Sequence, residues 1–159
     1  MCRLRFYWDC CIHFVLAKSR HGTHSPFVYR LVDEVIYARQ RMGEPKNKVK
    51  RLIARLAYRF SAQHVYEFGA GLPCGPLDFV VAEAKNPELL SHQLWQYWHA
   101  LHHGSVLIVL DIYRDERMKR LWQAIKRKPE VTVTVDLFHA GLVFFHPGQA
   151  KEDFKIRYY

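Results

Sequence analysis

Apolar residues in the first 62 positions recur at helical spacing. Between Ser25 and Gly43 they fall every three or four residues, as expected for a helix with one buried face: Val28, Leu31, Val32, Val35 and Ile36. Ser25 suits the cap of that helix and Pro26 its first turn. The same spacing predicts a helix from Lys48 to Phe60, with five basic residues facing water. We therefore predict an N-terminal helical segment over residues 1–62 that packs on the rest of the fold.

Beyond residue 62, short apolar runs alternate with helical patterns. Strands are expected at His64–Phe68, Leu77–Ala84 and Ser105–Ile112. The last of these has the continuous apolar run of a central strand covered on both faces. Helices are expected from Asn86 to about His103 and from Asp115 to Lys128, with Asn86 and Asp115 as their caps.

The final predicted elements form a hairpin. Val131–Phe138 alternates Val and Thr, turns at residues 139–141 and returns as Leu142–His146, which predicts an antiparallel pair at a sheet edge. Strands that alternate with helices predict an α/β core over residues 63–159, with helices on both faces of the sheet. No linker or repeat divides the chain, so we expect a single domain overall.

Composition and charge indicate which kinds of molecule this chain could bind and where it could be located. The chain has 159 residues, half of them apolar, and a formal net charge of +9 at pH 7. The basic residues are spread over positions 39–59 and 114–128, as solvated helix faces would be, so we do not expect a nucleic-acid binder. The four cysteines form no CxxC pair, which favours free thiols and a cytoplasmic location.

The first twenty residues are basic and apolar, but we do not expect them to be a secretion signal. Asp9 and His13 interrupt the apolar run, no small-residue cleavage site follows, and no stretch reaches the length of a membrane span. We expect an amphipathic helix that rests on the fold. Contact of this helix with a membrane surface is the other interpretation.

A glycine turn follows the first predicted strand. Glu67 ends the strand, and Gly69 and Gly71 allow the backbone to turn tightly beside a ligand, although many such turns hold none. Two further acids, Glu83 and Asp111, end the next strands. Because open α/β sheets bind ligands at the carboxyl ends of their strands, these positions predict a site for a nucleotide-like molecule.

With its elements in this order, the chain resembles class I S-adenosylmethionine-dependent methyltransferases, a Rossmann-like fold that ends in a C-terminal antiparallel hairpin. More narrowly, it resembles a bacterial methyltransferase-like group through three stretches: the HGTHSPF motif at residues 21–27, Asp111-Ile112 followed by Met118 and Trp122, and VTVTVDLF followed by GLVFF. The resemblance covers nearly the whole chain.

The resemblance implies a cofactor and roles for named residues. Glu67, Gly69 and Gly71 would hold the methionine portion of S-adenosylmethionine. Asp111 or Glu83 would accept a proton from a small-molecule acceptor, with His24 as a more distant candidate. In related O-methyltransferases such acids also hold a divalent cation, but the second ligand expected beside Asp111 is missing, so we assign no metal residues.

The connection after the glycine turn departs from the family pattern. Five residues separate Gly71 from Leu77, whereas a parallel crossover needs a dozen or more. So short a connection favours antiparallel pairing of the first two predicted strands, which would place Glu67 and Glu83 at opposite ends of the hairpin. Parallel pairing of these strands would require a shortened strand, an extended arch or strand exchange between chains. The family's second and third strands, with the acid that binds the cofactor ribose, are absent, as if two βα units were deleted.

Two functions follow from these observations. One is methyl transfer from S-adenosylmethionine to a small molecule. The other is a catalytically inactive relic that serves as a dimerising or partner-binding module, because lost strands expose a sheet edge that a second subunit could cover. We expect a homo-oligomer in either case.

Overall fold

The computed structural model describes residues 3–18, 25–68, 75–83, 86–148 and 150–158. The helices are α1 (Arg3–Leu16), α2 (Pro26–Leu31), the π-helical turn η2 (Val32–Ile36), α3 (Lys48–Arg59), α4 (Pro87–Gln96), the 3₁₀ turn η3 (Trp98–Ala100) and α5 (Glu116–Arg127). The strands are β1 (Tyr66–Glu67), β2 (Phe79–Ala82), β3 (Val106–Leu110), β4 (Val133–Asp136), β5 (Ala140–Phe144) and β6 (Glu152–Lys155).

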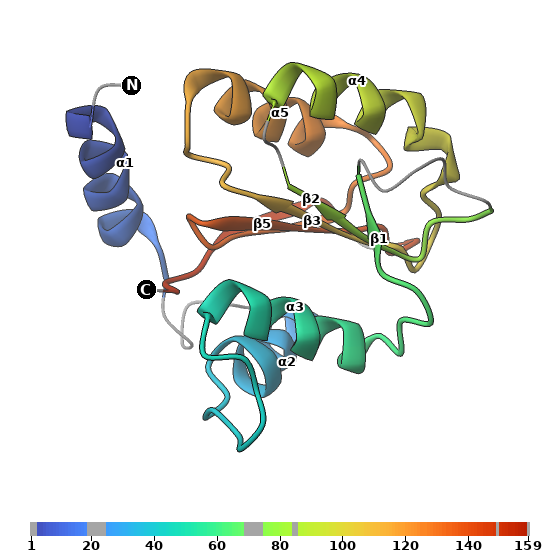
Figure 1. Ribbon diagram of the computed structural model, residues 1–159, viewed down its shortest axis with the longest axis horizontal. Coiled ribbons are helices and arrows are strands. Elements are labelled where there is room, and N and C mark those ends of the chain that lie inside the picture. Colours follow the sequence, from blue (N-terminus) through green and yellow to red (C-terminus); the bar gives the residue numbers. More distant parts are fainter. Residues whose placement is uncertain (1–2, 19–24, 69–74, 84–85, 149, 159) are drawn as a thin grey trace.

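The strands form one mixed six-stranded sheet in the order β1-β2-β3-β5-β4-β6. Strands β1, β2 and β3 are parallel, β6 is parallel to β4, and β5 runs antiparallel to both β3 and β4. Helices α4 and α5 cover one face, and α2 and α3 cover the other (Figure 1). The predicted α/β class, with helices on both faces, is therefore confirmed.

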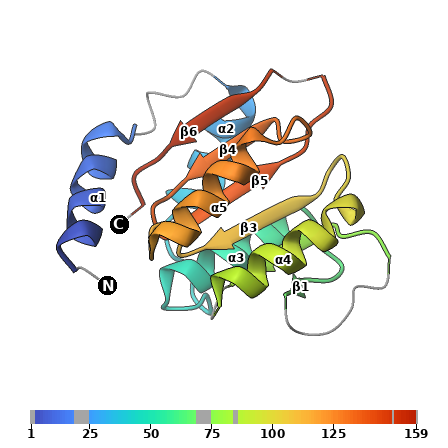
Figure 2. The same ribbon diagram turned by 90° about the horizontal axis from the view of Figure 1, so that it is seen from above.

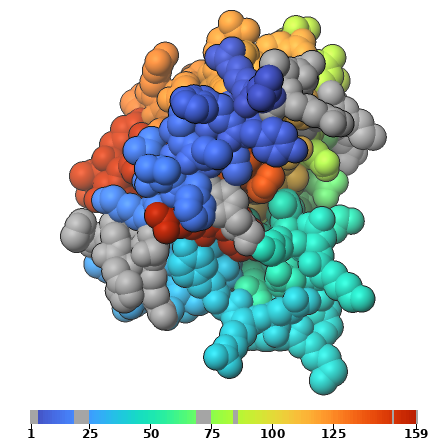
Figure 3. Space-filling view, turned by 90° about the vertical axis from the view of Figure 1, so that its left-hand side faces the viewer, coloured from blue at the N-terminus to red at the C-terminus, as the bar shows by residue number. Residues whose placement is uncertain are grey.

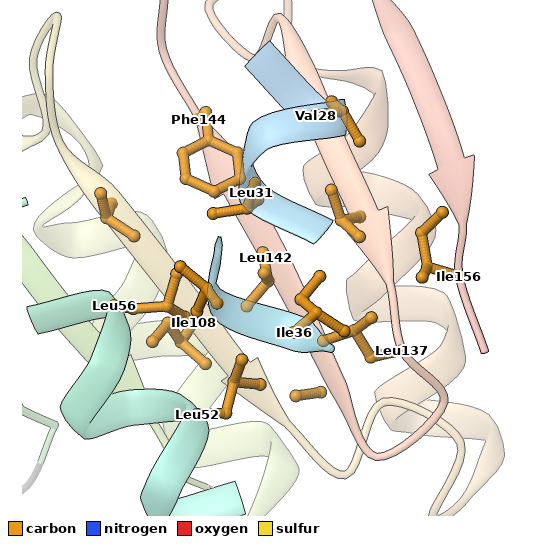
Figure 4. Packing of buried hydrophobic residues seen from close by; sticks show 14 of the residues in the cluster. Val28, Leu31, Ile36, Leu52, Leu56, Ile108, Leu137, Leu142, Phe144 and Ile156 are labelled. Atoms are coloured by element: carbon orange, nitrogen blue, oxygen red, sulfur yellow. The ribbon is translucent and has the colours of Figure 1, made fainter. Parts of the chain in front are cut away.

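Strand β3 explains why the core lies on both sides of the sheet. Its five residues are all buried, as predicted for a central strand. Successive strand side chains point to opposite faces. Ile108 therefore packs with α2, η2 and α3 (Figure 4), whereas Leu107 and Val109 pack with α4 and α5 on the other face.

The antiparallel pairing that we expected for the first two strands is wrong. Tyr66 pairs with Val80 and Glu67 with Val81 in parallel. The physical reason is that both strands are shorter than predicted, so that residues 68–78 form the connection. A chain of eleven residues can span about 36 Å when fully extended, which exceeds the return distance past a two-residue strand.

The two strands of the predicted hairpin are not the last strands of the sheet and do not lie at its edge. Strands β4 and β5 are antiparallel, with Val135 opposite Leu142. Strand β6 lies outside β4 and pairs with it in parallel from Glu152 to Lys155. We did not predict β6, because three of its four residues are charged and it lacks an apolar run. A bridge between Lys18 and Ile156 extends this side of the sheet to the segment after α1.

The observed helix starts agree with the predicted ones better than the observed helix ends do. The side chains of Asn47, Asn86 and Asp115 each accept hydrogen bonds from the first turns of α3, α4 and α5. Ser25 occupies the cap position of α2 without a side-chain capping bond. The helix after Asn86 ends at Gln96 instead of His103, and the helix after Ser25 ends in the π-helical turn at Ile36.

One of the basic residues predicted to face water on α3 is largely buried. Arg55 forms a two-pronged ion pair with Glu44, at 2.8 and 2.6 Å, and donates to the backbone oxygens of Val35, Ala38 and Arg39. It thereby satisfies carbonyl groups at the end of η2. This side chain joins α3 to the preceding segment.

Candidate functional site at the carboxyl edge of the sheet

The parallel pairing brings the predicted acids to one edge of the sheet. Glu67 ends β1, Glu83 directly follows β2, and Asp111 directly follows β3. All three residues are exposed. Among the described residues, no hydrogen bond or ion pair joins these carboxylates to one another. The carboxyl edge therefore presents three separate acids.

Asp111 has an unusual backbone conformation that ends β3. Its φ of +53° lies in the left-handed region, which Asp adopts more readily than most residues. Its N–H donates to the backbone oxygen of His139 at 2.8 Å, and its backbone oxygen accepts from the Arg114 N–H at 2.9 Å. These bonds hold Asp111 at the sheet edge beside the exposed His139.

A buried polar cluster lies at the same edge, at the end of β4. His13 Nε2 lies 2.9 Å from Asp136 Oδ1 and 3.2 Å from the Asp136 backbone oxygen. Since both are acceptors, Nε2 carries the hydrogen. The Tyr113 hydroxyl donates to Asp136 Oδ2 at 2.8 Å, and the Phe138 N–H donates to Oδ1 at 3.0 Å. The carboxylate therefore has three donors.

These donors determine the charge state of Asp136. Burial acts to raise the pKa of its carboxyl group, whereas the hydrogen bonds from His13, Phe138 and Tyr113 lower it. The donors prevail, so that the pKa of Asp136 lies below its ordinary value. Asp136 is therefore a carboxylate at neutral pH although its side chain is only 4% exposed.

The cluster fastens α1 across the carboxyl ends of the strands. Strands β3 and β6 point toward α1 in Figure 2. Besides His13, helix α1 contributes Asp9, which forms an ion pair with Lys119 of α5, and Phe6, whose ring contacts Phe138 edge to face at 5.1 Å. Helix α1 thus covers the part of the edge formed by the end of β4 and its turn.

Two clefts are relevant to a ligand. One of about 260 Å³ borders the carboxyl edge between α1 and the start of α5, lined in part by Phe6, Asp9, Tyr113 and Lys119. Another, of about 730 Å³, lies between α3 and the segment after η2, and its lining includes Arg55. None of the predicted acids lines the larger cleft, and the guanidinium of Arg55 already binds Glu44 and three backbone oxygens there.

Gly69, Gly71 and His24 lie outside the described residues. Within the described ranges, no group of three or more His, Cys, Asp or Glu residues could hold a metal ion.

The sequence analysis assigned no site role to four residues at this edge: His13, Tyr113, Asp136 and His139. Two of them could have been noticed in the sequence. Asp136 is a charged residue within an apolar strand, and His13 interrupts the apolar run of the first helix. Such residues are buried only with a partner, but nothing local indicates that the two partner each other across 123 positions.

Comparisons with models of protein families, with curated proteins and with solved structures found no match.

Proposed function

We propose that this chain is a shortened S-adenosylmethionine-dependent methyltransferase that acts on a small molecule. One observation carries the proposal: the ends of β1, β2 and β3 lie at one edge and present Glu67, Glu83 and Asp111 to solvent. Open α/β sheets bind ligands at this edge. Glu67 also shortly precedes the Gly69-x-Gly71 motif that the family resemblance associates with the cofactor.

The residues at this edge suit the methionine portion of the cofactor. Glu67 is exposed at the end of β1, where its carboxylate can accept hydrogen bonds from an ammonium group. When bound, S-adenosylmethionine supplies a methyl group on a positively charged sulfur. A row of carboxylates is an electrostatically favourable surface for such a cation.

The small molecule that accepts the methyl group would bind beside the ends of β2 and β3. Asp111 or Glu83 would take the proton that the acceptor loses on methylation, which is general-base catalysis. The two backbone hydrogen bonds of Asp111 keep its carboxylate at the edge. His24, the more distant candidate base, is carried by the sequence resemblance alone.

Titration with S-adenosylhomocysteine in a calorimeter tests the proposal. We expect saturable binding that Glu67→Gln weakens about tenfold or more, because a hydrogen bond to a charged group contributes about 1.5–3 kcal/mol. Glu130→Gln, which neutralises an exposed acid away from this edge, should bind as the unaltered chain does. Absence of heat from folded protein would reject cofactor binding.

Transfer of a labelled methyl group to a panel of small hydroxyl, thiol and amine acceptors tests catalysis. Asn adopts the left-handed conformation as readily as Asp, so Asp111→Asn should preserve the backbone. We expect this variant to bind S-adenosylhomocysteine normally and to lose about 10²-fold or more of the transfer rate. Unchanged transfer would exclude Asp111 as the base.

A second candidate is the inactive relic that acts as a dimerising or partner-binding module. The observation that favours it is the size of β1, a two-residue strand at the edge of the sheet. Among the described residues no strand lies beyond β1, where the family resemblance would place the ribose-binding acid. A folded chain that ignores S-adenosylhomocysteine and sediments as an oligomer would support this candidate.

A further inference from the structure

The outer face of α1 carries an apolar stripe along the length of the helix. Its members recur at helical spacing and are exposed: Leu4 (79%), Tyr7 (63%), Trp8 (68%), Cys11, Ile12 (40%) and Val15 (75%). Figure 3 looks onto this side of the molecule, with α1 in dark blue across it. We call these six residues the outer stripe.

The outer stripe is distinct from the face that attaches α1 to the fold. The inner face holds α1 through Phe6, Asp9 and His13. Because these contacts already fasten the helix, the exposed side chains are not needed for its packing. A continuous apolar surface of this kind is typical of an interaction site.

The charges around the outer stripe are mainly positive. Among the described side chains of residues 4–18, Arg5 and Lys18 are basic and Asp9 is the single acid; Arg5 pairs with Glu116 at 3.2 Å, and Asp9 pairs with Lys119. The guanidinium of Arg157 donates to the backbone oxygens of Phe14 and Ala17 at the end of α1, which adds a further cation. The whole chain carries a net charge of +9.

We propose that the outer stripe docks onto the surface of an anionic lipid bilayer, with α1 parallel to the membrane plane. Apolar residues of such a helix enter the boundary between headgroups and acyl chains, and nearby basic residues attract anionic lipids. Tyr7 and Trp8 are the residue types that favour this boundary. The inference is independent of the proposed methyl transfer.

The length of α1 and the charge of the chain favour docking on a bilayer surface over spanning the bilayer or pairing with a second copy. Helix α1 has 14 residues and is about 21 Å long, shorter than the roughly 30 Å hydrocarbon core. Within the described residues, none of the helices combines the length and hydropathy that crossing a bilayer requires. A second copy would bring together two chains of +9 over a few side chains, whereas stable interfaces use about 20–30 residues per side.

Co-sedimentation with lipid vesicles tests the proposal on the full chain. We expect binding to vesicles of phosphatidylcholine mixed with phosphatidylserine, little binding to phosphatidylcholine alone, and weaker binding at high salt. The double variant Trp8→Ser/Val15→Ser should bind about tenfold more weakly or worse because it loses apolar area without a change of charge. Trp8→Phe, which keeps the apolar ring, should retain most of the binding.

A matched control removes exposed apolar side chains elsewhere. Met42 and Leu89 are 102% and 55% exposed, and Met42→Ser/Leu89→Ser should bind vesicles as the unaltered chain does. Circular dichroism and thermal unfolding establish that all variants are folded. Failure to bind the mixed vesicles, or equal losses in both double variants, overturns the proposal. It is also overturned by a dimer that ignores vesicles and dissociates in Trp8→Ser/Val15→Ser, since the stripe would then cover a second copy.

Discussion

Replacing His13 by Ala tests whether the buried pair with Asp136 attaches α1 to the sheet. The imidazole is 1% exposed, donates to the carboxylate and lies with its ring 5.5 Å from that of Phe138. The variant removes the hydrogen bond and leaves space in the contact between α1 and the sheet. We therefore expect a less stable fold with a loosened first helix.

The structure sets bounds on this loss. A hydrogen bond to a charged group contributes about 1.5–3 kcal/mol, and a buried charge left with no partner costs about 3–5 kcal/mol. Asp136 keeps two donors in the variant, the Tyr113 hydroxyl at 2.8 Å and the Phe138 N–H at 3.0 Å. The loss should therefore lie nearer the first range, at about 2–3 kcal/mol.

Urea unfolding followed by far-ultraviolet circular dichroism measures this loss. A double-mutant cycle with Asp136→Asn separates the pair from other effects: the two losses should fall short of additivity by about 1 kcal/mol or more. Hydrogen exchange should accelerate most in α1. A change below about 0.5 kcal/mol for His13→Ala, or additive losses in the cycle, would refute the role of the pair.

Three further outcomes are expected. Gly141→Ala places a Cβ 2.6 Å from ring carbons of the buried Trp122, so urea unfolding should show a loss of about 1–3 kcal/mol; unchanged stability would mean that the ring moves aside. The pKa of Asp136 is lowered on folding, so its carboxylate stabilises the fold above about pH 4, and this stabilisation is lost as the pH falls through the pKa of the folded state. The melting temperatures of Asp136→Asn and the unaltered chain should therefore converge at that low pH. Glu44, whose pKa the Arg55 guanidinium lowers to about 2, should behave likewise: Glu44→Gln melts earlier at pH 7, and the difference should close as the pH approaches 2.

Local patterns in the sequence determined much of this fold. The continuous apolar run at Val106–Leu110 identified the central strand, because only a strand covered on both faces buries every side chain. Asp115 identified the start of α5, because its carboxylate accepts from the first N–H groups of the helix. The exposed acids at strand ends were likewise visible as acids that follow apolar runs.

Tertiary structure decided the geometry of the site. Whether Glu67 and Glu83 share an edge depends on the direction in which β1 pairs with β2, and residues 68–78 are long enough to permit either direction. The partnership of His13 with Asp136 joins positions 123 residues apart. Hydrophobic periodicity and helix caps are local interactions, so the sequence by itself determined the type and order of most elements, although not β6 or the exact lengths of β1 and β2. Strand direction and the pairing of buried charges depend on which distant segments pack together, and only the folded chain determines that.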